Sequence, residues 1–370
     1  MILFGGLSLD DAFRAIDLRT ITLLLGMLVI TGYLAEARLF AWLAHRTVTR
    51  ARTARTLLVA LVLVSGALSA VLVNDTVCLV FAPFVLAVAE EAGLDPLPFL
   101  LAVGMGSNIG GAATYTGTPQ TMMIGEASGV SYAHYALRAA PVAALGLAAL
   151  AGLLLFVFRS QLPRGQLRPR NPAVPEVDRP GLARALVVLA ATVLSFWLGA
   201  GLALGAITGA AALLLFGGRD PNVVLARVDW SLLLFFGALF VVMGGVAHTG
   251  VAEQTYDWLA PLFGRSPERQ LAGFGAFTAL ASNVVSNVPF VMLAKHWVPR
   301  FADPTRAWYV LALASTFAGN LTTVGSVANL IVLEAARERA PIGFFRFMIV
   351  GVPVTLVTLA LAVVAAWIVP

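Results

Sequence analysis

Charged residues are scarce in this sequence of 370 residues. Asp, Glu, Lys and Arg together make up 12% of the chain, about half of the roughly 25% that is typical of soluble domains. So little charge could not cover a folded surface with polar groups, and 59% of the residues are hydrophobic. The scarcity of charge therefore excludes an ordinary soluble domain and predicts an integral membrane protein.

Cysteine and the common catalytic motifs are also scarce. The single cysteine, Cys78, lies inside an apolar block, so the sequence offers neither a disulfide framework nor a thiol metal site. No Gly-x-x-x-x-Gly-Lys phosphate loop and no Gly-x-Ser-x-Gly motif occur. The first residues have no charged segment before an apolar core, so no cleaved signal peptide is expected. These absences argue against an ATP-driven pump and against a membrane-embedded hydrolase, and we expect no enzyme.

The apolar blocks predict membrane-spanning helices. They lack the period-two alternation of barrel strands, and a helix needs about 20 apolar residues to cross a bilayer. Blocks that reach or approach this length are residues 18–34, 132–158, 182–198, 202–216, 230–247 and 344–368.

Two further blocks are interrupted by polar residues. In block 56–89 the triplet Asn-Asp-Thr at 74–76 precedes an arm that is too short to span, which predicts a re-entrant hairpin. Block 98–125 is broken at 107–108 and again at 110–119 by glycines, hydroxyls and a proline. Non-helical backbone at membrane depth is tolerated only inside protein or beside water. The breaks therefore predict a binding site.

Arginines concentrate in residues 36–55 and 159–181, which we interpret as cytoplasmic loops under the positive-inside rule. A re-entrant hairpin and two crossings between them return the chain to the same side. The basic pI near 9.9 thus reflects the orientation of the chain in the membrane, and no nucleic-acid partner is expected. The expected location is a bacterial inner (plasma) membrane.

The same plan recurs about 212 residues later in the chain. Five crossings separate Asp17 from its counterpart Asp229, and an odd number predicts that the second copy enters from the opposite face. Inverted repeats with paired discontinuous helices are typical of secondary transporters. The matched segments are 16–20 with 228–231, 69–74 with 282–287, 111–118 with 319–326, and 141–142 with 353–354.

The predicted fold class is an all-α polytopic membrane protein with inverted structural repeats. Each repeat contains a re-entrant helical hairpin and a discontinuous transmembrane helix. Residues 1–158 form the first repeat, which is expected to lack one or more leading helices. Residues 159–181 form a cytoplasmic linker rich in Pro and Arg, and residues 182–370 form the second, inverted repeat.

Asp75 is the one carboxylate embedded in an apolar block. An ionisable group at that depth costs at least about 2.5 kcal/mol and usually marks a proton or ion pathway. The alternative is that residues 56–73 span the bilayer and Asn74-Asp75 is a surface turn. Ser69, Ser282 and Asn283 are expected to serve helix packing.

The polar breaks supply the predicted site, because helix ends, amides and hydroxyls suit a small polar solute. Substrate binding is assigned to Asn74, Thr76, Thr114, Thr116, Thr118, Ser286, Asn287, Thr322, Thr323 and Ser326. Ion coupling is assigned to Asp75, with Asn74, Ser107, Asn108, Gly117, Asn287, Asn320 and Gly325.

At these residues the chain resembles the ion transporter superfamily of arsenite permeases, NhaD-type sodium/proton antiporters, divalent anion/sodium symporters and citrate transporters. The resemblance is most specific in residues 107–119, which are similar to the family's Gly-rich interrupted helix. In the symporters each hairpin tip carries a Ser-Asn-Thr motif that contacts substrate and sodium. Asn74 and Asn287 match its central Asn, and Ser286 matches the second Ser. The resemblance also favours a homodimer.

The chain departs from the symporter motif at Val73, Asp75 and Val288. An ionised Asp75 would repel a dicarboxylate at close range. Arsenite permeases and NhaD-type proteins also carry an Asp beside this Asn, in the order Asp-Asn, so the present order is a variant. The resemblance therefore implies a carrier of a small oxyanion or a metalloid acid such as arsenite.

The predicted function is secondary active transport of such a solute across the bilayer, coupled to protons or sodium, with no cofactor beyond the coupling ion. A sodium/proton antiporter without an anion substrate is the main alternative, and its activity would depend on sodium and pH alone. A channel is the other alternative, and it would give single-channel currents.

Overall fold

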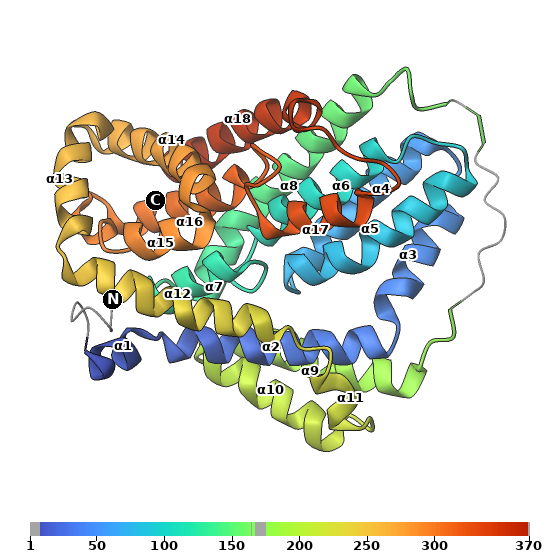
Figure 1. Ribbon diagram of the computed structural model, residues 1–370, viewed down its shortest axis with the longest axis horizontal. Coiled ribbons are helices and arrows are strands. Elements are labelled where there is room, and N and C mark those ends of the chain that lie inside the picture. Colours follow the sequence, from blue (N-terminus) through green and yellow to red (C-terminus); the bar gives the residue numbers. More distant parts are fainter. Residues whose placement is uncertain (1–7, 164, 167–174, 369–370) are drawn as a thin grey trace.

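The computed structural model describes residues 8–163, 165–166 and 175–368, and this part of the chain is built from helices (Figure 1). Sequence and structure agree on the main spans, because five helices are long and apolar enough to cross a membrane. The segment 202–216 is a helix of 15 residues between Gly201 and Gly217, with the predicted bounds, and it is shorter than the five long spans. The first eight helices are α1 (Leu9–Ala15), α2 (Leu18–Glu36), α3 (Leu39–Arg50), α4 (Ala54–Ser69), α5 (Asn74–Glu91), α6 (Leu97–Gly111), α7 (Pro119–Ala127) and α8 (Tyr132–Val157).

The order of helix types in α2–α8 recurs in the second half. In both halves a long helix is followed by a shorter one, a helix pair, a pair separated by a break, and a last long helix. The remaining elements are α9 (Arg179–Trp197), α10 (Leu202–Phe216), α11 (Pro221–Leu225), α12 (Trp230–His248), α13 (Val251–Phe263), α14 (Pro267–Val285), α15 (Asn287–Ala294), η2 (Val298–Arg300), α16 (Pro304–Ala318), α17 (Val327–Ala336) and α18 (Phe344–Ile368).

Local details of the two halves also correspond. Asp17 and Asp229 cap α2 and α12 by accepting backbone N–H bonds in the first turn. The residue before α3 and the residue before α13, Arg38 and Gly250, both have positive φ, at 61° and 70°. Equivalent sequence positions therefore direct the chain through the same turns twice.

The helices form two groups (Figure 1). Helix α2 packs against α9, α10, α11 and α12 along one side of the molecule. In the other group, α5 packs against α17, α15 packs against α7, and α8 packs against α18. Each half thus contributes a helix pair whose second arm contacts the broken helix of the other half.

Two predicted loop boundaries are wrong. Residues 36–55 were expected to be a loop, but α3 occupies most of them, because Leu39, Phe40, Ala44 and Val48 recur on one face and are buried. The predicted linker 159–181 ends earlier than expected, since α9 begins at Arg179 behind its Asp178 cap. Residues 164 and 167–174 of this linker lie outside the described part of the chain.

The predicted interruptions appear at the expected residues. Helix α5 begins at Asn74, and Ser286 separates α14 from α15 in a left-handed conformation (φ 73°). Residues 112–118 separate α6 from α7, and residues 319–326 separate α16 from α17. The first break is tightly packed, because a Cβ atom at Gly110 would collide with the backbone of Gly66 in α4.

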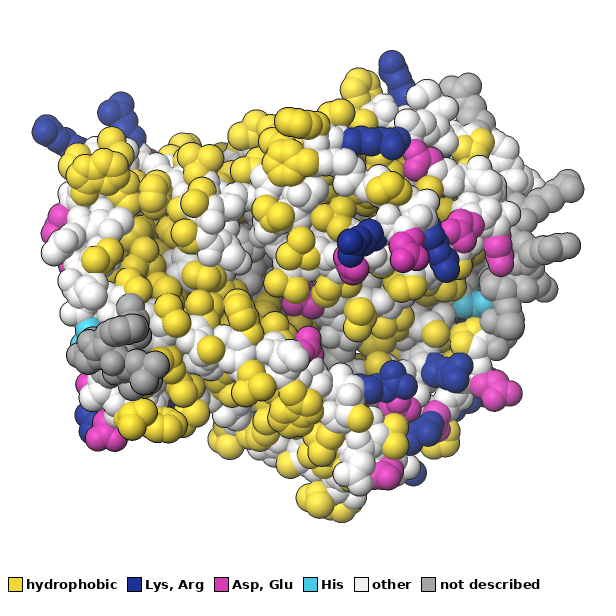
Figure 2. Space-filling view, viewed as in Figure 1, with side chains coloured by type: hydrophobic (Ala, Val, Ile, Leu, Met, Phe, Trp, Pro, Cys, Tyr) yellow, Lys and Arg dark blue, Asp and Glu magenta, His cyan; other side chains and the backbone are white. Residues whose placement is uncertain are grey.

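The outer surface suits a lipid environment. Figure 2 shows hydrophobic side chains over most of one face, with charged side chains mainly towards the ends of the long axis. Val284 is 83% exposed and Phe345 is 81% exposed. Extended exposed apolar surface of this kind is costly in water and marks membrane contact.

Candidate functional site

A network of asparagine side chains joins the two halves at the helix breaks. The Nδ2 group of Asn108 donates to Oδ1 of Asn320 (2.9 Å) and to Oγ of Ser326 (2.9 Å). Its Oδ1 atom accepts from Nδ2 of Asn74 (3.1 Å). All four side chains are buried. One asparagine therefore connects the start of α5 with the break between α16 and α17.

Helix ends position the members of this network. Asn108 lies in the last turn of α6, and Asn74 opens α5 with its backbone N–H donating to the carbonyl of Gly117 (3.0 Å). Ser326 is the N-cap of α17 and accepts from the backbone N–H of Asn329 (3.1 Å). Each break leaves backbone groups unpaired within its own helix, and these side chains satisfy part of them.

Four buried side-chain oxygens near the breaks have no hydrogen-bond partner among the described residues. They are Oγ of Ser69 and Oδ1 of Asn74, at the first helix pair, and Oγ of Ser282 and Oδ1 of Asn287, at the second. The two sets occupy matching positions of the repeat. Unpaired buried oxygens are costly unless a ligand satisfies them. Amide and hydroxyl oxygens fit a hard cation or the donor groups of a hydroxylated solute.

Most of the predicted threonines are engaged within the protein. Thr114 donates to the carbonyl of Ala70 (2.5 Å) and lies 3.1 Å from the hydroxyl of Thr116. Thr322 donates to Oδ1 of Asn283 (2.8 Å). In both halves, a hydroxyl from the break is thus bonded to the neighbouring helix pair.

The two cap residues behave in the same way. Thr118 caps α7 through a capping box with Thr121, as Ser326 caps α17. Gly117 and Gly325 pack closely against the carbonyls of Gly111 and Gly319, where a Cβ atom would not fit. These residues shape the breaks, and among the described residues the oxygens of Ser69, Asn74, Ser282 and Asn287 stay unpartnered beside them.

Asp75 lies in the first turn of α5 and is half-buried. The positive end of a helix dipole favours a carboxylate there. Within the described part of the chain Asp75 forms no ion pair. A carboxylate beside the asparagine network with no fixed cation can take up a proton or a mobile cation.

The remaining predicted residues differ in how closely they join the network. Ser107, the residue before Asn108, donates to the carbonyl of Gly104 (2.8 Å) and lies 3.0 Å from Sγ of Cys78. Thr323 is 9% exposed, and Thr76 is half-buried beside Asp75. Ser286 supplies the turn between α14 and α15 through its backbone.

Sequence reasoning missed several polar groups at the breaks. Ser69 and Ser282 were assigned to packing, yet their hydroxyls are unpartnered, and their matched positions in the repeat were the available signal. Nδ2 of Asn329 donates to the carbonyl of Gly319 (2.6 Å), and Nε2 of Gln120 donates to Thr316 (3.3 Å). Both lie in the second arms of broken helices, where no motif indicated them.

The chain is similar to several proteins that are named as transporters. The chain is 33% identical to an uncharacterized transporter of Mycobacterium tuberculosis, over 99% of this chain and 91% of that protein. It is 31% identical to the silicon efflux transporter LSI3 of rice (Oryza sativa subsp. japonica), over 98% of this chain and 89% of that protein. The fold resembles the YdaH transporter of Alcanivorax borkumensis, with a TM-score of 0.64 and 17% identity, covering 100% and 87% of the two chains.

The family assignment rests on the sequence profile of the citrate transporters (CitMHS), which matches residues 1–314. This match covers Asn74 and Asn108 of the asparagine network and ends within α16, before Asn320 and Ser326. The predicted membrane insertion is confirmed, as is the prediction of a transporter and not an enzyme. The chain is an integral membrane protein of the citrate transporter family.

Proposed function

We propose that this protein is an ion-coupled secondary transporter of a small oxyanion or a hydroxylated metalloid acid. The proposal rests on two matching sets of buried oxygens that have no partner among the described residues. One set comes from Ser69 and Asn74 and the other from Ser282 and Asn287, next to the asparagine network. A carrier needs a polar site that pairs with its solute and ions and then releases them. Fully satisfied packing bonds would not serve that purpose.

The coupling ion is a proton or sodium. Sodium would be held by the amide oxygens of Asn74 and Asn287 and by the hydroxyls of the two serines, Ser69 and Ser282, in the first arm of each helix pair. Hard cations prefer such oxygen ligands. A proton would be carried by Asp75, whose carboxylate has no cationic partner in the described residues. Neutralisation of Asp75 would also let an anion approach the first helix pair without repulsion.

The substrate class follows from the family and from the donors at the site. Citrate is an oxyanion, and the rice relative is named for efflux of silicon, a metalloid whose hydroxylated acid is uncharged near neutral pH. Both present oxygens and hydroxyls that amide groups and helix N-termini can bind. Thr76, Thr323 and Ser286 would add hydroxyl groups to the proposed binding surface. Thr114, Thr116, Thr118, Thr322 and Ser326 are bonded within the protein and would shape the breaks around it.

The proposed architecture is an inverted repeat in which both helix pairs are re-entrant. Residues 1–158 form the first repeat, residues 159–181 contain a cytoplasmic linker, and residues 182–370 form the second repeat. The recurrence of helix types, capping residues and breaks supports this arrangement. The arginine-rich segments would face the cytoplasm of a bacterial inner membrane, and the core would alternate access between the two faces.

The test is transport by the purified chain in proteoliposomes with imposed proton or sodium gradients. Citrate, succinate, sulfate, arsenite and silicic acid would each be offered to the native chain, to Asp75→Asn and to Glu91→Gln. Glu91 is the matched control because it lies at the exposed opposite end of α5. We expect gradient-driven movement of one solute, lost or uncoupled in Asp75→Asn and retained in Glu91→Gln. Sodium/proton exchange with no solute movement would contradict the proposal and favour an antiporter.

A further inference from the structure

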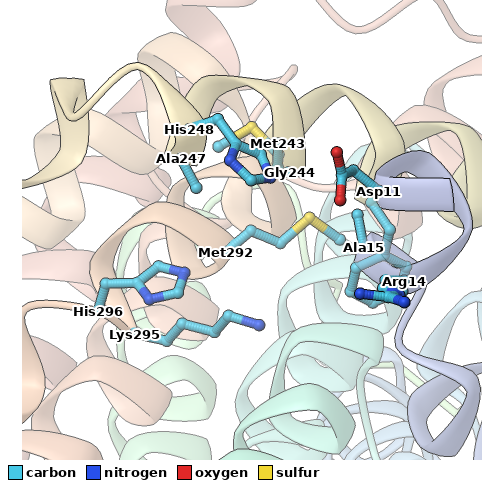
Figure 3. Close-up of a pocket in the computed structure, with 11 residues that line it drawn as sticks. Asp11, Arg14, Ala15, Met243, Gly244, Ala247, His248, Met292, Lys295 and His296 are labelled. Carbon is cyan, nitrogen blue, oxygen red and sulfur yellow. The ribbon is translucent and has the colours of Figure 1, made fainter. Parts of the chain in front are cut away.

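A cavity outside the helix breaks is lined by several cationic side chains. It has a volume of about 490 Å³ and lies between α1, the C-terminal part of α12 and the end of α15. Figure 3 shows Lys295 and Arg14 extending into it from opposite sides, with His248 above and His296 beside Lys295. The volume lies within the range of about 300 to 1,000 Å³ that is usual for small-molecule sites.

The residues that line this cavity carry a net positive charge. Asp17, which acts electrostatically on Lys295, and Glu253, which acts on His296, lie outside the lining. Arg14 and Lys295 supply two positive charges and Asp11 one negative charge, which leaves +1 with both histidines neutral and up to +3 with both protonated. Neither Arg14 nor Lys295 forms an ion pair within the described part of the chain. The sulfur-containing wall of Met243 and Met292 lowers the local polarity and strengthens the attraction of an anion.

Helix α1 separates apolar from charged side chains beside the cavity. Leu9 is 63% exposed and Phe13 is 70% exposed on α1, one turn apart, while Asp11 and Arg14 line the cavity. This division of apolar and charged faces is typical of a helix that lies in the membrane interface. An anion could therefore reach the cavity either from solution or from the lipid headgroups.

Helix α15 connects the cavity with the proposed transport site. Lys295 follows α15 directly, and α15 begins at Asn287, whose Oδ1 atom is unpartnered. Eight residues of helix span about 12 Å. An anion held by Lys295 would thus lie about one length of α15 away from the unpartnered Oδ1 atom of Asn287.

We propose that this cavity is an anion-binding vestibule, in which Lys295 and Arg14 hold the carboxylate, sulfate or phosphate oxygens of a small anion. If the bound anion is the transported solute on its way to the helix breaks, this role rests on the proposed function. The binding itself does not, because the cationic side chains and the cavity are present whichever solute the helix breaks accept.

The test is alkylation of a cysteine introduced by Ala247→Cys, which lines the cavity. The native Cys78 is buried and should stay silent. Anionic and cationic methanethiosulfonates of similar size would be compared in phosphatidylcholine nanodiscs. We expect the anionic reagent to react faster, and Lys295→Gln or Arg14→Gln to lower the anionic-to-cationic rate ratio by about tenfold. Arg265→Gln, an exposed arginine outside the cavity, should leave the ratio unchanged.

Added anions identify the occupant. Protection of the cysteine by citrate or sulfate in neutral lipid would support a solute site, and protection only in phosphatidylglycerol would support the same site filled by a lipid phosphate. Lys295→Arg should retain both the rate ratio and the protection, which separates charge from misfolding. A ratio near one that is insensitive to Lys295→Gln and Arg14→Gln, without protection by any anion, would overturn the proposal. Labelling requires no transport, so failure of the transport proposal would leave this result readable.

Discussion

The asparagine network predicts a large and specific loss of stability in Asn108→Ala. The substitution removes the bonds to Asn320 and Ser326 (2.9 Å each) and the bond from Asn74 (3.1 Å), all at buried sites. Side-chain hydrogen bonds in membrane proteins contribute about 0.6 kcal/mol on average and up to about 1.7 kcal/mol. Three of them, with partners left unpaired, predict a decrease of about 2 to 4 kcal/mol in the free energy of unfolding.

The assay is unfolding in mixed micelles titrated with a denaturing detergent. Asn222→Ala is the control, because Asn222 lies exposed at the start of α11, and its loss should stay within about 0.5 kcal/mol. A double-mutant cycle of Asn108→Ala with Asn320→Ala should give a coupling energy, since the two amides bond directly across the halves. A loss no larger than that of the control, or strictly additive losses, would refute the view that this network holds the halves together.

Three further outcomes are expected. Gly110→Ala should remove the folded-protein peak in gel filtration, because the added Cβ atom would collide with the backbone of α4. A Cβ atom added at Gly152 meets no neighbouring atom within 4 Å, so Gly152→Ala should elute like the native chain. Ser282→Ala should change the unfolding free energy by less than about 1 kcal/mol, since its hydroxyl has no described partner, yet weaken the sodium or proton dependence of uptake. The pKa of Asp178 is lowered by the bond from the Gly181 backbone and by Arg219, so its contribution to stability is present above its unfolded value of 3.8 and is lost as the pH falls below it. Unfolding titrations should show this acid-dependent loss in the native chain and a smaller one in Asp178→Asn.

Local patterns in the sequence were sufficient for the elements around the breaks. The polar residues at 74–76 and 286–287 mark the beginnings of α5 and α15 because a polar residue is unfavourable inside a lipid-facing helix and common at a helix start. The boundaries between helices and loops were predicted less well. The arginines of 36–55 indicated a loop, but the apolar face of α3 buries against its neighbours and overrides the charge pattern.

The site could be predicted only in outline. The repeat indicated that Asn74 and Asn287 have matching roles, and both amide oxygens are buried and free. It could not indicate that Thr114 and Thr322 would be consumed in bonds to the helix pairs, because those partners come from distant segments. A hydroxyl in a sequence can bind a solute or a carbonyl with equal ease, and only its neighbours decide which.

The sequence by itself determined the membrane location, the all-helical class, the positions of the breaks and the internal repeat. These follow from composition and from periods along one chain, where the cost of burying charge or unpaired backbone in lipid is a local quantity. Tertiary structure alone decided that Asn108 would join Asn74 to Asn320 and Ser326, and that Arg14 and Lys295 would share one cavity. The contacts of Asn108 with Asn320 and Ser326 join residues 212 and 218 positions apart. The energies of such contacts exist only once helix packing has brought the side chains together.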